Sequence, residues 1–131
     1  MKKFFSVLAV LFCLVSVSYA QKGVMKFKEE THNFGKIVKD VPVNHKFVFT
    51  NTGKDPIIIS KVNASCGCTT PSFSKDPVLP GKTGFIEASF NAAAMGNFNK
   101  SITIISNAES STLTLFIKGE VIDKKSAPST K

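Results

Sequence analysis

Residues 98–106 read FNKSITIIS, a stretch in which apolar and polar side chains largely alternate. The alternation yields two faces: Phe98, Lys100, Ile102 and Ile104 on one, and Asn99, Ser101 and Thr103 on the other. A period of two is that of a β-strand, whereas apolar residues of an amphipathic helix recur about every three to four positions. The stretch therefore predicts a strand with one face on a hydrophobic core.

Six further stretches have strand patterns: residues 24–28, a short extension at 32–35, then 43–50, 57–62, 85–90 and 113–118. Turn signals separate them, the densest at 51–56 and the clearest at Pro80-Gly81. About seven short strands at roughly ten-residue spacing are typical of an immunoglobulin-like antiparallel β-sandwich. We therefore predict an all-β fold of this kind over residues 21–122. These residues lack the tryptophan and the widely separated cysteines of antibody domains.

The first twenty residues have the pattern of an export signal. Lys2 and Lys3 precede an apolar run at 4–17, and Ser18-Tyr19-Ala20 is a small-x-small cleavage site. Cys13 follows a phenylalanine, which favours cleavage and release over lipid attachment. We therefore predict a signal peptide at 1–20 and an exported protein of the periplasm, cell surface or extracellular space. After cleavage no apolar stretch is long enough for a transmembrane span, and the polar residues 123–131 predict a disordered tail.

The charge pattern argues against a nucleic-acid partner. All 17 basic residues are lysine, against 9 acidic residues, and the net charge is +8. The lysines are scattered, whereas nucleic-acid binders cluster their basic residues and use arginine for base contacts. Once Tyr19 leaves with the signal, the chain has no Trp, Tyr or Arg, the residues enriched at binding hot spots. We therefore expect that the partner is another envelope protein and that it binds through an exposed strand edge.

The remaining two cysteines lie in Ser65-Cys66-Gly67-Cys68-Thr69, which we expect in a connecting hairpin. A Cys66–Cys68 disulfide is feasible but tight, and Gly67 can adopt turn conformations closed to other residues. One interpretation is a loop staple or simple packing. A second is thiol–disulfide exchange, although thioredoxin-type sites place C-x-x-C at a helix N-terminus and the flanks here are β-like.

A third interpretation of the cysteines is a metal site. Cys66 and Cys68 with His32 and His45 would form a Cys₂His₂ set that suits zinc, and the thiolates alone would suit copper(I). Each histidine is alone on its predicted strand, however, and His45 is next to Lys46, which indicates a solvated face. The sequence itself therefore assigns no metal ligand and no cofactor.

Motifs of conventional catalysis are missing from the sequence. It contains no G-x-S-x-G, no Walker loop and no H-E-x-x-H. Glu29 and Glu30 are neighbours that would point to opposite faces of a strand, so they do not form a carboxylate pair. We therefore predict no catalytic residues and a protein that is not an enzyme.

The order and spacing of several motifs resemble a known family of exported bacterial proteins. They are His32-Asn33-Phe34-Gly35-Lys36-Ile37, Phe47-Val48-Phe49-Thr50-Asn51-Thr52-Gly53, Ser65-Cys66-Gly67-Cys68-Thr69, Pro80-Gly81, Gly96-Asn97-Phe98 and Ser106-Asn107. The chain resembles the domain-of-unknown-function family DUF1573, itself similar to Hydin-type immunoglobulin-like domains and, more distantly, to pilus-chaperone and major-sperm-protein sandwiches. The resemblance implies an exported β-sandwich and no assigned reaction.

Together these observations predict an exported, non-enzymatic binding or scaffolding module of the cell envelope. The alternative is a thiol–disulfide or metal-handling protein, for zinc or copper, that works through the Cys-Gly-Cys loop.

Overall fold

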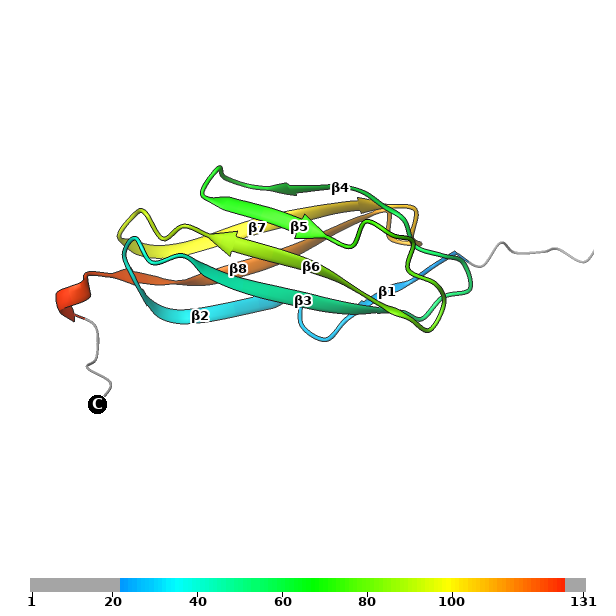
Figure 1. The fold of residues 1–131 in the computed structure, drawn as a ribbon, viewed down its shortest axis with the longest axis horizontal. Coiled ribbons are helices and arrows are strands. Elements are labelled where there is room, and N and C mark those ends of the chain that lie inside the picture. Colours follow the sequence, from blue (N-terminus) through cyan, green and yellow to red (C-terminus); the bar gives the residue numbers. More distant parts are fainter. Residues whose placement is uncertain (1–21, 127–131) are drawn as a thin grey trace, which may run out of the picture.

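A computed structural model describes residues 22–126, which form two four-stranded sheets packed face to face (Figure 1). The first sheet has the order β1 (Met25–Phe27), β3 (Val43–Asn51), β6 (Thr83–Phe90), β5 (Thr69–Phe73). The second has the order β2 (Thr31–Val38), β8 (Thr112–Ile122), β7 (Gly96–Ser106), β4 (Ile59–Ala64). The predicted all-β immunoglobulin-like sandwich is confirmed.

The structure describes only the beginning of the predicted tail and none of the predicted signal peptide. The signal peptide at 1–20 lies outside the described residues, and so do residues 127–131 of the predicted tail. The beginning of that tail contains a short 3₁₀ turn, η1 (Lys124–Ser126). Within residues 22–126, no helix has the length and apolar character needed to cross a bilayer.

The core lies between the sheets and follows the predicted alternation. The buried side chains of the first sheet include Phe47, Phe49, Ile86, Ala88 and Phe90, and those of the second include Phe98, Ile102, Ile104, Leu115 and Ile117. Each set occupies every second position of its strand, so one face of each sheet is apolar and turned inward.

The topology differs from the prediction in three respects. β2 pairs with β8 in parallel, so the second sheet is mixed, although every other pairing is antiparallel. β2 also continues through the expected turn at Gly35, which has φ +68° and lies at a bulge in the pairing with β8. The third difference is β5, an eighth strand that the sequence did not predict. Its Pro71 conceals the strand pattern and is tolerated because β5 lies at an edge of its sheet.

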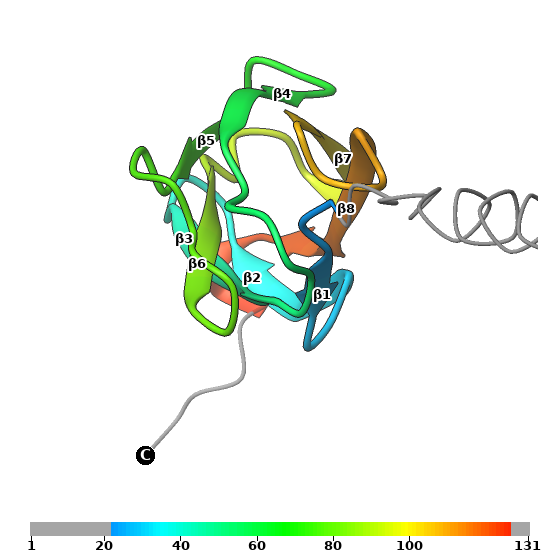
Figure 2. The same cartoon turned by 90° about the vertical axis from the view of Figure 1, so that its right-hand side faces the viewer.

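The sandwich has two sides at which edge strands of different sheets meet. β1 and β2 are consecutive edge strands joined by residues 28–30, while β4 and β5 are consecutive edge strands joined by residues 65–68. Figure 2, which looks along the strands, shows these two crossings from one sheet to the other. Cys66 and Cys68 lie at the second crossing, and Glu29 lies at the first.

Candidate functional site

The Cys-Gly-Cys segment connects β4 in one sheet with β5 in the other, so it does not form the expected hairpin. Two backbone hydrogen bonds hold it: Thr69 N–H donates to the Cys66 carbonyl (3.4 Å), and Asn91 N–H donates to the Cys68 carbonyl (3.0 Å). The two sulfurs lie at bonding distance and the Cα atoms are 5.3 Å apart, well inside the range that disulfides use. The redox state and role of the pair stay predictions.

Gly67 does not supply the unusual backbone conformation that we expected of it. The described glycines with left-handed φ are Gly35, Gly81 and Gly96. A Cβ at Gly67 would meet no atom within 4 Å. The turn between the cysteines is therefore open to residues other than glycine.

A small hollow of about 140 Å³ lies beside Cys68. Phe90 and Phe98 line it with their rings stacked at a centroid distance of 4.2 Å, and Met95, which is 54% exposed, lies at its rim. Neither histidine lines this hollow. The cysteine loop thus borders a mainly apolar surface and has no imidazole that could serve as its general base.

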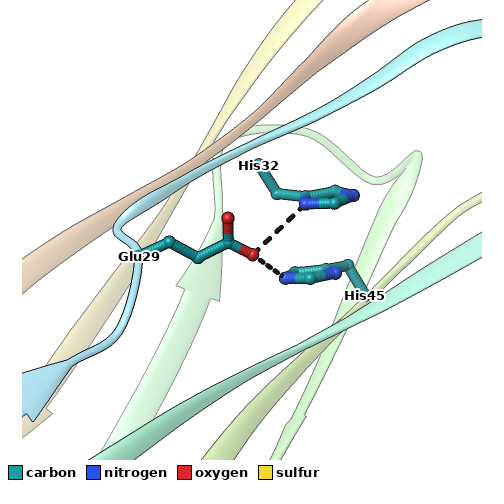
Figure 3. Close-up of side chains that lie close together, drawn as sticks. All are labelled: Glu29, His32 and His45. Atoms are coloured by element: carbon teal, nitrogen blue, oxygen red, sulfur yellow. Dashed lines mark hydrogen bonds and ion pairs between the residues drawn. The ribbon is translucent and has the colours of Figure 1, made fainter.

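A second cluster forms at the opposite side of the sandwich, where His32, His45 and Glu29 meet (Figure 3). His32 lies on β2 and His45 on β3, so the two imidazoles come from different sheets, while Glu29 lies in the β1–β2 connection. Glu29 Oε1 is 3.2 Å from His32 Nδ1 and 2.6 Å from His45 Nε2. Their possible ligand atoms all lie within 4.8 Å of one another.

Aromatic rings fix the positions of the two imidazoles. The rings of His32 and His45 stack in parallel, with centroids 3.5 Å apart and an interplanar angle of 5°. The ring of Phe34 meets His32 edge-on at 4.7 Å, and that of Phe47 meets His45 edge-on at 4.7 Å. The stack therefore rests on the hydrophobic core, and the carboxylate of Glu29, whose side chain is 45% exposed, lies towards solvent.

The electrostatics of the cluster favour a neutral His45. Burial and, second, the neighbouring His32 lower the pKa of His45 below its ordinary value, while Glu29 acts in the opposite direction. His45 Nε2 is the one buried side-chain nitrogen or oxygen in residues 22–126 that lacks a hydrogen-bond partner. Glu29 Oε1 makes an ion-pair contact with this nitrogen at 2.6 Å.

The structure corrects three predictions about these residues. The Cys₂His₂ set is wrong, because the cysteines and the histidines lie at opposite sides of the sandwich and, within the described residues, only Glu29 joins the histidines. The solvated face predicted for His45 is also wrong, because His45 shares the inward face of β3 with Phe47. Glu29 was predicted to lie on a strand with Glu30, but it lies in the connection between β1 and β2, and so its role beside the histidines was missed. Its i, i+3 spacing to His32 was the only local signal.

The fold defines the class of protein, an immunoglobulin-like β-sandwich with one parallel strand pair. Over residues 25–121 the chain matches the family described as Protein of unknown function (DUF1573), and it belongs to that family. None of the curated proteins is similar enough in sequence to be a match. The Hydin-type relationship remains an expectation.

Solved structures with the same fold come from diverse proteins. A protein of unknown function from Porphyromonas gingivalis W83 is 17% identical, with a TM-score of 0.69, over 83% of this chain and 51% of its own. The VesB protease of Vibrio cholerae is 14% identical, with a TM-score of 0.63, over 74% of this chain and 32% of its own. The ASH/PapD-like domain of human CEP192 is 8% identical, with a TM-score of 0.64, over 78% of this chain and 87% of its own. This chain thus spans about half of the Porphyromonas gingivalis protein and about a third of the VesB protease. The likeness to all three structures shows the fold alone.

Proposed function

We propose that this protein is an exported, non-enzymatic binding or scaffolding module of the cell envelope that recruits a partner protein by strand addition to β4. The sequence at residues 1–20 supports export. The observation that carries the proposal is the free edge of β4, which presents backbone groups to solvent. The partner is another exported protein with an extended segment.

The other three edge strands are each less suited to strand addition. β1 has three residues, β2 is interrupted by the bulge at Gly35, and β5 contains Pro71, which lacks an N–H. β4 has a bulge between Ile59 and Lys61, after which its pairing with β7 is regular to Ala64. Bulges and prolines are devices that protect sheet edges. β4 therefore has the least protected edge of the described sheets.

The hydrogen bonding of β4 shows which groups are free. Ser65 N–H donates to the Ser101 carbonyl of β7 (2.9 Å). Backbone groups alternate in direction along a strand, so those of Asn63 and Lys61 also face β7, whereas those of Val62 and Ala64 face outward. An added strand would pair with Val62 and Ala64. The side chain of Asn63 is exposed and suitable for a probe.

A photo-reactive amino acid at Asn63 tests this proposal in the cells that produce the protein. We expect a discrete adduct with another exported protein, because the probe lies on the edge strand. Ala64→Pro should abolish the adduct since proline removes an outward N–H without removing a bond to β7. The matched variant Ala64→Val keeps this N–H and should retain the adduct. Thermal unfolding of both variants checks that they fold.

A probe at Lys118, an exposed position on the central strand β8, is the positional control. The proposal is wrong if Asn63 gives no adduct, if Lys118 gives the same adduct, or if the adduct survives Ala64→Pro. A mature N-terminus at Gln21 is expected for the exported protein, and an unprocessed chain in the cytoplasm would contradict its export.

A further inference from the structure

The cluster of Glu29, His32 and His45 combines the side chains of a divalent transition-metal site. Two imidazoles and one carboxylate form a set that binds zinc and related ions, and three protein ligands leave a coordination position for water or another molecule. We propose that these three residues bind a divalent ion of the zinc type, which goes beyond the binding function proposed above.

The convergence of the three donors carries this proposal. Glu29 and His32 lie close together in the chain and His45 lies on the other sheet, yet the ligand atoms of all three gather within 4.8 Å. Donors of a tetrahedral ion with bonds of about 2.1 Å lie about 3.4 Å from one another. The distances from Glu29 Oε1 to the imidazole nitrogens are 3.2 Å and 2.6 Å, so the carboxylate must shift outward to make room for an ion.

The unpartnered nitrogen of His45 is the second observation. A buried polar atom without a hydrogen bond is unfavourable, and native structures have few of them. A metal ion would give His45 Nε2 a coordination bond in addition to its ion-pair contact with Glu29 Oε1.

Metal binding requires one local change in this arrangement. An imidazole coordinates a metal ion through a nitrogen lone pair that lies in the plane of its ring. Because the rings of His32 and His45 stack in parallel, their lone pairs lie in two parallel planes and do not point at one shared ion. At least one ring therefore turns about its Cβ–Cγ bond and the stack separates. This movement should change the chemical shifts of the ring protons of both histidines and of Phe34, whose edge contacts His32.

A bound ion would join the two sheets at the β1–β2 side. Ligands that bind the folded but not the unfolded state raise stability by mass action. Zinc binding should therefore raise the melting temperature of the protein. This readout does not depend on any activity of the protein.

Zinc titration of tag-free protein, purified from cells that export it, tests the proposal. The titration uses the Cys66→Ser/Cys68→Ser variant, so that thiolates contribute no binding. We expect one zinc per chain and a rise in melting temperature. Glu29→Gln and His32→Gln should each weaken binding at least about tenfold and reduce the rise in melting temperature. Glu30→Gln is the matched control, because Glu30 is adjacent to Glu29 but outside the cluster, and it should bind as the parent does.

Cobalt(II) gives an independent readout because its visible absorption reports the ligand geometry. We expect cobalt absorption in the parent and its loss in His32→Gln, together with altered histidine ring shifts when zinc binds. The proposal is overturned if the cysteine-free parent binds no zinc, if Glu30→Gln weakens binding as much as Glu29→Gln, or if neither cluster variant changes the affinity.

Discussion

At the scale of single residues, Asn51 at the end of β3 organises one end of the sandwich. Its side chain is fully buried, accepts hydrogen bonds from Val24 N–H and Gly53 N–H, and donates to the carbonyls of Asp55 and Val78. Its backbone N–H donates to the Lys82 carbonyl, and its carbonyl accepts from Gly81. The sequence indicated only a turn here, but the turn depends on a buried amide with all of its side-chain groups paired.

Asn51→Ala should lower the free energy of unfolding by about 2–4 kcal/mol, because it leaves four backbone groups without their partner. Asn44→Ala is the control, since Asn44 is exposed on the same strand, and it should change stability by less than about 0.5 kcal/mol. Urea unfolding measures both variants. Equal losses would show that the Asn51 network contributes nothing specific.

The cluster of His32, His45 and Glu29 shows where residue-level prediction fails. The sequence suggested that the histidines were separate and that His45 was solvated, because each is alone on its strand. Their contact forms only when the two sheets stack, since β2 and β3 belong to different sheets. Glu29 and His45 are also far apart along the chain. Pattern and spacing describe neighbours on one element, whereas this site depends on the packing between elements.

At the scale of elements, side-chain alternation predicted most strands and their inward faces. Phe47 and Phe49 of β3, and Ile102 and Ile104 of β7, are buried as predicted. The differences come from features that break the alternation locally, namely Pro71 in β5 and the bulge at Gly35 in β2. The cysteine loop was placed in a hairpin because consecutive strands usually pair. Instead it crosses between the sheets, and the local side-chain pattern does not determine whether two consecutive strands pair or cross.

Cys66→Ser/Cys68→Ser should lower the free energy of unfolding by roughly 1–2 kcal/mol if the pair is a staple, because a bond across one intervening residue restricts the unfolded chain only slightly. The fold should be retained, since backbone hydrogen bonds of Cys66 and Cys68 also hold the loop. Thermal unfolding with and without reductant makes the comparison. A reduction potential close to that of known oxidants would instead favour the thiol–disulfide alternative.

At the scale of the whole molecule, the two sides of the sandwich differ in chemistry. The β1–β2 side contains the histidine cluster, and the β4–β5 side contains the cysteine loop and the least protected edge strand. Several motifs that carry the family resemblance have structural roles. Asn51 holds its turn, Gly81 has φ +78°, and Asn107 pairs with the backbone of Pro56 and Ile58. These motifs define the fold, and our two proposals concern the β4 edge and the cluster of Glu29, His32 and His45.

Amide hydrogen exchange along β4 tests most directly whether this strand offers a vacant edge. The N–H groups of Lys61 and Asn63 should exchange slowly because they bond to β7, while those of Val62 and Ala64 should exchange fast because they face solvent. Equal protection at all four positions would mean that the edge is already covered, and equal fast exchange would mean that β4 is not paired as described. Either result would contradict a module that binds its partner by adding a strand at this site.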